Sequence, residues 1–285
     1  MFAKLLKYEW KANASLLWIL SACALGVGLL GAGIIRAIDY ISNKMLNDQM
    51  AAIATTGLGS IMVFVVIALA AYALAVQFIN IFRFYKNKFT DEGYLTFTLP
   101  VTSHQIFLSS FLVILAWLAI SVVVLVISIG LMAIIGTGAP IKEIWDSIVM
   151  IVKGLVEGFS YMEEFGMPGV SAYIIMCVAQ VFVAPVYAIV LLMTSITLGC
   201  VLAKKHKILA SIGMYYVINM AVNAISSILT IVPTLMMIGS AMSGSEDYFK
   251  HMTLAMVLSL VLQVGLAIGG YFWSTYLMKH KLNLP

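Results

Sequence analysis

Charged residues are scarce in this sequence, and their scarcity excludes a soluble globular protein. Asp, Glu, Lys and Arg make up 10% of the 285 residues, whereas hydrophobic residues make up 63% and the mean hydropathy is +1.07. A typical soluble domain has about 25% charged residues, because its surface must be hydrated. The sequence therefore predicts an all-α, polytopic membrane protein.

Several chemical motifs are also missing. The three cysteines are isolated from one another in the sequence and lie in apolar runs, which favours neither a disulfide framework nor a metal site. The sequence has no HExxH and no GxSxG motif, so the usual membrane hydrolases are disfavoured. It also has no GxxxxGK[ST] loop, so any ATP and Mg²⁺ that drive this protein must be bound by another polypeptide. No cofactor is predicted in this chain, and nothing in it indicates nucleic-acid binding.

The sequence instead has uncharged runs that are long enough to cross a membrane. A spanning helix needs about 20 apolar residues, and six runs meet this length, at 14–35, 53–82, 106–136, 169–202, 208–238 and 253–278. None contains Asp, Glu, Lys or Arg, which disfavours a carrier that binds protons or sodium through a buried carboxylate. We therefore predict one transmembrane domain over residues 1–285.

The distribution of Lys and Arg predicts the orientation. Cytoplasmic segments of membrane proteins carry an excess of these residues. If both termini are cytoplasmic, only Arg36, Lys44, Lys142, Lys153 and Lys250 of the 16 lie in outer segments. An even number of spans and this bias predict that both termini face the cytoplasm.

Residues 1–12 are predicted to form an amphipathic elbow helix in the membrane interface. Three lysines fall on one face of a helical wheel, and Leu5, Leu6 and Trp10 fall on the other. Glu9 lies on the apolar side, where a carboxylate is costly. It either reaches up to the headgroups or pairs with a cytoplasmic loop or a partner protein.

The outer insertion 137–168 is predicted to hold a second amphipathic helix, from Ile141 to Phe159. Apolar and charged residues in this segment recur at spacings of three and four and occupy opposite faces. Such a helix either rests on the outer membrane surface or caps a cavity.

The fifth span carries a polar stripe, and two prolines indicate bends. The stripe residues follow spacings of three and four: Tyr216, Asn219, Asn223, Ser226 and Thr230. Neutral polar groups of this kind either join helices by hydrogen bonds or line a path for an amphiphilic substrate. Pro185 is expected to bend the fourth span, and Pro233 is expected to end the fifth, leaving a re-entrant piece over 234–242.

The loop 83–105 between the second and third spans is the longest segment available to a cytoplasmic partner. Asp91 and Glu92 provide an acidic helix start, Tyr94 and Phe97 an apolar face, and Pro100 a stop. A short helix of this kind can insert into a groove of a soluble protein. The alternative is an ordinary connecting loop.

Four features occur together in this chain: LLKYEWK, six spans, DEGYLTFTLPVTSHQ after the second span and the long run after the fifth. In this combination the chain resembles the permease subunits of bacterial ABC transporters, in the type 2 exporter superfamily. The layout of the whole chain carries this resemblance, but only 91–105 is specific in sequence. The outer insertion is longer than expected for the smallest members.

The resemblance implies a bacterial plasma-membrane protein that pairs with ABC ATPase subunits and with a second permease chain, identical or related. The residues implied to contact the ATPase are Glu9, Asp91, Glu92, Gly93, Tyr94, Phe97, Leu99 and Pro100. The polar stripe of the fifth span would border the path of an exported amphipathic or hydrophobic substrate, such as an antimicrobial peptide, a drug or a lipid-like molecule. A stand-alone carrier or channel and a membrane-embedded enzyme are the alternatives.

Overall fold

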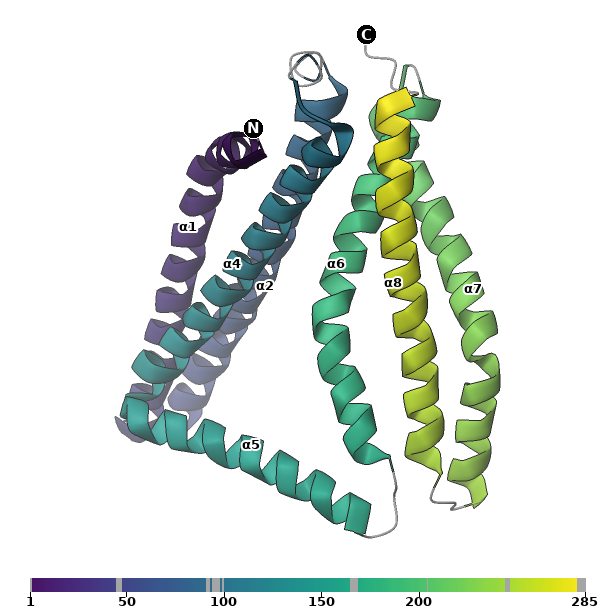
Figure 1. The fold of residues 1–285 in the computed structure, drawn as a ribbon. Helices are drawn as coiled ribbons and strands as arrows, with labels where there is room; N and C mark the ends of the chain where they lie inside the picture. Colours follow the sequence, from purple (N-terminus) through teal and green to yellow (C-terminus); the bar gives the residue numbers. More distant parts are fainter. Residues whose placement is uncertain are drawn as a thin grey trace. The chain divides into compact units, whose positions relative to one another are not determined.

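The computed structural model consists almost entirely of long α-helices. The residues that it describes are 2–44, 48–90, 93, 98, 100–164, 169–203, 205–243 and 247–280. Within them lie α1 (Phe2–Lys44), α2 (Asp48–Phe89), α4 (Ser103–Thr137), α5 (Ile141–Glu164), α6 (Val170–Leu202), α7 (Lys207–Ser243) and α8 (Tyr248–His280), shown in Figure 1. No residue of this part forms a β-strand, so the all-α class is confirmed.

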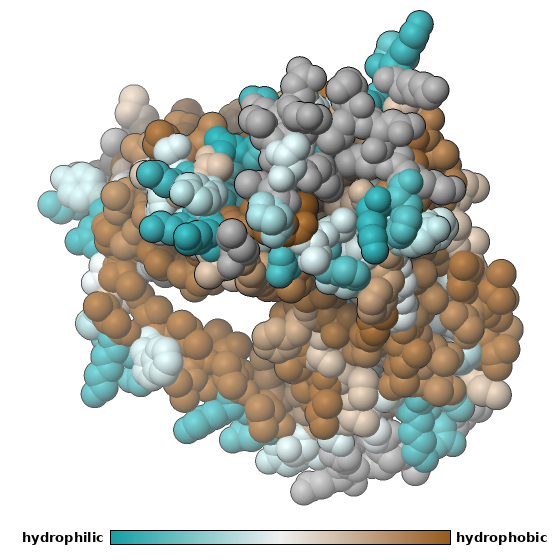
Figure 2. All heavy atoms as spheres, turned by 45° about the horizontal axis from the view of Figure 1, so that its top comes forward, coloured by the Kyte–Doolittle hydropathy of each residue, from teal (hydrophilic) through white to brown (hydrophobic). Residues whose placement is uncertain are grey.

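Six of these helices, all except α5, are long and apolar enough to cross a membrane, which confirms the predicted number of spans. Large apolar side chains face outwards along them; Phe64 is 70% exposed and Met220 is 77% exposed. Figure 2 shows hydrophobic residues over the helix sides and hydrophilic residues gathered near helix ends. Exposed apolar surface of this extent is stable in lipid rather than in water.

Contacts divide the chain into two compact units. The N-terminal unit comprises Ala3–Arg83 and Leu112–Ile151, and the C-terminal unit comprises Met1–Phe2, Phe84–Phe111 and Val152–Pro285. Nearly all of α1, most of α2 and most of α4 build the first. Helices α6, α7 and α8 build the second, together with the end of α2 and the start of α4.

The core of the N-terminal unit lies where α1, α2 and α4 meet. Leu17 of α1, Val76 of α2 and Trp117 of α4 are at most 1% exposed. Gly28 lets α1 approach α4 closely, because a Cβ atom at this position would lie only 3.0 Å from the Cβ of Ser128. Small residues allow spanning helices to pack in this way where lipid gives no hydrophobic drive to associate.

The N-terminal segment of α1 differs from the predicted elbow helix. The helix runs without interruption from Phe2 to Lys44, and Figure 1 shows its first turns bending away from the rest. The three lysines of the segment are exposed, but its apolar face packs on protein, since Trp10 stacks on Trp117 with ring centroids 4.9 Å apart. Stacked aromatic rings bury a large apolar area. The elbow is thus the bent start of α1 rather than a separate helix.

Gly138 explains how α4 ends and α5 begins. Its φ of +68° is favourable for glycine, and its N–H donates to the Ile134 carbonyl at 3.2 Å, which satisfies an end carbonyl of α4. Pro140 follows, and its carbonyl accepts the Glu143 N–H at 3.0 Å in the first turn of α5. The sequence Gly-Ala-Pro therefore turns the chain sharply (Figure 1).

The predicted outer helix is confirmed as α5, which continues beyond Phe159 to Glu164. Its apolar residues are exposed in the single chain; Trp145 is 64% and Ile151 is 63% exposed. The membrane-surface position of this helix stays a prediction.

We predict that Gly138→Ala destabilises the N-terminal unit by about 1–2 kcal/mol, because alanine disfavours the left-handed conformation. The added Cβ would also collide with the guanidinium of Arg36, which lies against this turn. The midpoint of heat-induced aggregation in detergent measures the effect. Gly130→Ala in α4 is the control, because a Cβ there has open space. Equal midpoints for the two variants would contradict the role assigned to Gly138.

Hydrogen bonds join the helices of the C-terminal unit. The Gln180 amide of α6 donates to Gln263 Oε1 of α8 at 2.9 Å, and the Ser274 hydroxyl of α8 donates to Thr194 Oγ1 of α6 at 3.0 Å. Both pairs lie within long apolar helices, where lipid offers these groups no partner. They therefore fix how α6 and α8 face each other.

The predicted break at Pro233 is wrong. Helix α7 continues from Lys207 to Ser243 with Pro233 inside it, so the described part of this segment contains no separate re-entrant piece. Proline removes one N–H, but spanning helices tolerate the loss because small backbone adjustments and neighbouring groups satisfy the freed carbonyl. Pro185 lies inside α6, and Figure 1 shows the predicted bend of that helix.

Candidate functional site

The helix ends that flank the predicted coupling loop are held by aromatic side chains of the C-terminal unit. Phe84 meets Phe89 at the end of α2 with ring centroids 5.7 Å apart, and it meets Phe107 of α4 at 6.3 Å. Phe107 in turn meets Tyr271 of α8 at 5.3 Å. The three phenylalanines are at most 3% exposed. These four residues, here called the aromatic clamp, attach both flanks of the loop to α8.

Hydrogen bonds fix the same flanks. The Lys207 ammonium at the start of α7 donates to the Phe89 carbonyl at 3.3 Å, which satisfies a terminal carbonyl of α2. The start of α4 is a reciprocal cap: the Thr102 N–H donates to Gln105 Oε1 at 3.3 Å, and the Gln105 N–H donates to Thr102 Oγ1 at 3.4 Å. Thr-x-x-Gln is a capping-box sequence. These bonds therefore hold the end of α2 and the start of α4 on either side of the loop.

The predicted coupling residues are only partly described. Gly93 is buried, and its N–H donates to the Thr90 carbonyl at 2.8 Å. Pro100 is exposed, and Glu9 is half-buried in the N-terminal unit. Asp91, Glu92, Tyr94, Phe97 and Leu99 lie outside the described residues. The coupling helix and its contacts stay predictions.

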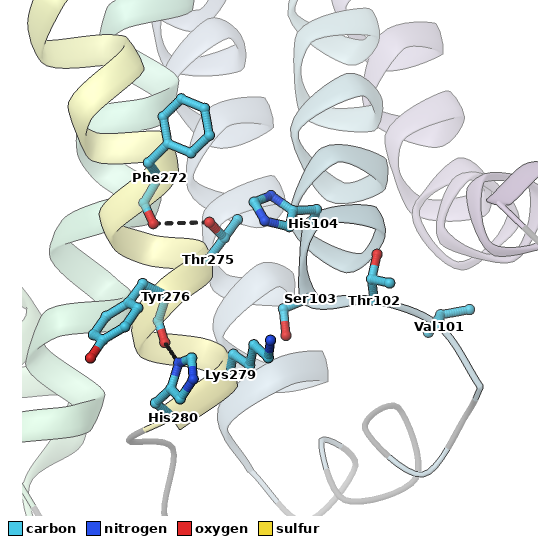
Figure 3. Close-up of a pocket in the computed structure, with 9 residues that line it drawn as sticks. All are labelled: Val101, Thr102, Ser103, His104, Phe272, Thr275, Tyr276, Lys279 and His280. Carbon is cyan, nitrogen blue, oxygen red and sulfur yellow. Dashed lines mark hydrogen bonds between the residues drawn. The ribbon is translucent and has the colours of Figure 1, made fainter.

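A groove lies between the start of α4 and the last turns of α8 in the C-terminal unit (Figure 3). It has a volume of about 670 Å³ and is lined by Val101, Thr102, Ser103, His104, Phe272, Thr275, Tyr276, Lys279 and His280. His280 Nδ1 lies 3.2 Å from the Tyr276 carbonyl; a carbonyl only accepts, so Nδ1 carries the hydrogen of this bond. Lys279 is positively charged and none of these lining residues is acidic, so the lining carries a net positive charge.

The predicted polar stripe lies on the surface of α7. Tyr216 is 69% exposed, Asn223 is exposed, and Asn219, Ser226 and Thr230 are half-buried. The Thr230 hydroxyl donates to the Ser226 carbonyl at 2.8 Å within the helix. Among the described residues, the two asparagine amides have no hydrogen-bond partner on α6 or α8. Within the described part of the C-terminal unit, the asparagine amides therefore do not join α7 to α6 or α8, and both interpretations of the stripe stay predictions.

A buried polar cluster in the N-terminal unit was not predicted. Asn13 of α1 donates from Nδ2 to Asn80 Oδ1 of α2 at 3.3 Å, and both side chains are at most 4% exposed. Asn13 Oδ1, Asn80 Nδ2 and the buried Trp117 Nε1 have no partner in the described structure. A contact between residues 67 positions apart has no signal in a single sequence.

The described residues contain no group of three or more His, Cys, Asp or Glu side chains that could hold a metal ion. Comparison with known proteins adds no assignment: the chain matches no protein-family model, no curated protein and no solved structure. Function must therefore be argued from the geometry of the stripe, the clamp and the groove.

Proposed function

We propose that this chain is the permease subunit of an ATP-driven ABC transporter that exports an amphipathic or hydrophobic substrate. The observation that carries the proposal is the exposed polar stripe of α7. Asn219 and Asn223 lie on a helix long and apolar enough to span a membrane, and within the described part of the C-terminal unit neither amide has a hydrogen-bond partner on another helix. A side-chain amide is costly in lipid without a partner. The stripe is best explained by a second permease chain, a substrate path, or both.

The aromatic clamp supports the proposal that a separate ATPase subunit drives the transporter by contacting the loop. A loop that transmits force needs rigid flanks, and Phe84, Phe89 and Phe107 provide buried, interlocking contacts there. Because this chain lacks a nucleotide-binding loop, the ATP and Mg²⁺ belong to a separate ATPase subunit. The segment 91–99 is the proposed contact with that subunit.

The proposed mechanism is alternating access. ATP binding brings two ATPase subunits together, and each draws the coupling loop of its permease chain with it. Because the loop is continuous with α2 and α4, these helices tilt and close an inward-facing cavity. Substrate then leaves between two copies of α7, along a surface whose methionines adapt to irregular apolar shapes.

Co-purification tests this proposal. We predict that the tagged chain, extracted from its own host in mild detergent, carries a soluble protein with a phosphate-binding loop in near-equal amount, as identified by mass spectrometry. An unrelated tagged six-span protein from the same membranes is the control for non-specific recovery. A second six-span chain in the eluate would distinguish a heterodimer from a homodimer. Recovery of this chain alone, even after cross-linking through 91–105, would favour a stand-alone carrier or an enzyme.

A further inference from the structure

We propose that the groove between the start of α4 and the end of α8 binds the headgroup of an anionic phospholipid. The inference requires only that the long apolar helices cross a membrane. It does not depend on the proposed ATPase partner or on the direction of transport.

The last turn of α8 contributes cationic and hydrogen-bonding groups to the groove. Lys279 and His280 are exposed in the last turn of α8, and Figure 3 shows the Lys279 side chain extending towards Ser103 at the start of α4. No carboxylate of the described residues forms an ion pair with Lys279. A phosphodiester would accept hydrogen bonds from the Lys279 ammonium and the Ser103 hydroxyl, and charge-assisted bonds of this kind are among the stronger ones.

The start of α4 adds donors to the same place. The backbone N–H groups of Ser103 and His104 lie in the first turn of the helix, where they have no carbonyl four residues earlier within the helix. The Thr102 side chain already caps the Gln105 N–H at 3.4 Å, and no acceptor for the two earlier N–H groups is found among the described residues. They supplement the Lys279 charge.

Polarity decreases along α8 from the groove towards the middle of the span. Tyr276 and Phe272, which are 56% and 59% exposed, lie one and two turns before Lys279. At a rise of about 1.5 Å per residue, the backbone positions of Tyr276 and Phe272 lie about 5 Å and about 10 Å along α8 from that of Lys279. A phospholipid has the same order of groups, from phosphate through glycerol to acyl chain. A small soluble phosphate ester such as glycerol phosphate has no apolar part that would contact the exposed Phe272 ring.

The position and size of the groove fit this ligand. Helix ends with Lys and aromatic residues lie at the level of lipid headgroups, and basic pockets between spanning helices are suited to anionic headgroups. A volume of about 670 Å³ lies within the range of small-ligand sites, about 300–1,000 Å³. Electroneutral headgroups would leave the cationic lining uncompensated, which favours an anionic lipid such as phosphatidylglycerol.

Native mass spectrometry of the purified full chain tests the site. We predict that the chain retains phosphatidylglycerol in preference to phosphatidylcholine with the same acyl chains. The variant Lys279→Gln/His280→Gln is expected to retain about fivefold less phosphatidylglycerol, or lower still, because it loses at least one cation near the anionic headgroup. Lys279→Arg is expected to retain the lipid, which distinguishes loss of charge from loss of folding.

The control is Lys4→Gln/Lys7→Gln, which removes two exposed cations from the start of α1. If both double variants lose phosphatidylglycerol equally, the binding is general surface attraction and the groove assignment is overturned. Unchanged retention in the groove variant overturns it as well. A further arm adds soluble glycerol phosphate at millimolar concentration. Displacement of the lipid by that compound would show that the groove recognises a free phosphate ester and would overturn the choice of a lipid.

Discussion

Gly199→Ala is expected to lower the stability of the C-terminal unit by about 2 kcal/mol or more, because overpacking a tight contact forces backbone displacement. Gly199 lies in α6 where this helix crosses α7, and a Cβ added there would fall inside the backbone of Ser211. The Ser211 hydroxyl donates to the Lys207 carbonyl at 2.8 Å and lies within hydrogen-bond distance of the Ile196 carbonyl, at 3.3 Å. The substitution must therefore separate two backbones, not merely move a flexible side chain.

Thiol labelling at Cys200 measures this separation. Cys200 is buried with its Sγ 3.7 Å from Ser211 Oγ, so a maleimide should react with it slowly in the wild-type crossing and quickly in Gly199→Ala. Cys23 and Cys177 are replaced by serine in both proteins to leave one thiol. Gly213→Ala is the matched control, since a Cβ two residues beyond Ser211 has open space. Equal labelling of Gly199→Ala and Gly213→Ala would show that the crossing is not tight.

The spans could be predicted from the sequence because lipid selects against charge along a whole run of residues. The absence of charge marks only the part of a helix inside the hydrocarbon, however. The uncharged run 53–82 lies within α2, which extends to Phe89. Backbone hydrogen bonds of a helix can continue from hydrocarbon into water, so the end of the uncharged run does not mark the end of the helix. Amphipathic periodicity likewise predicted α5, since spacings of three and four are a property of the helix itself.

Features that depend on contacts between distant residues could not be predicted. Pro233 was expected to end a helix on local grounds, yet α7 continues through it. Trp10 was placed on the apolar face of the predicted interfacial helix, and its stacking on Trp117 was not predicted. A local rule thus predicted the wrong end for the fifth span, and a helical wheel says nothing about which distant residue a side chain contacts. The aromatic clamp was missed for the same reason, because Phe84, Phe107 and Tyr271 show no common spacing.

Tyr94→Ala/Phe97→Ala is expected to reduce transport by about tenfold or more while the membrane part stays folded, since aromatic anchors often dominate the energy of an interface. The expectation rests on the proposed insertion of the 91–99 segment into the ATPase. Efflux of an amphipathic fluorescent dye from proteoliposomes that contain the whole complex measures transport, and phosphate release measures ATP hydrolysis. Hydrolysis is expected to continue without driving efflux.

The position of the two substitutions distinguishes a loss of coupling from a folding defect. The flanks of the loop are held by Phe89 and Phe107, which are 1% and 0% exposed, so truncating side chains between them leaves the aromatic clamp intact. Tyr161→Ala provides the control, because this tyrosine is 60% exposed on α5, on the side predicted to be outer. If the loop couples the two subunits, only the loop variant separates hydrolysis from efflux. Unchanged efflux in that variant would mean that the loop is an ordinary connection, and the ATPase contact would then have to be sought elsewhere, first at the exposed lysines of α1.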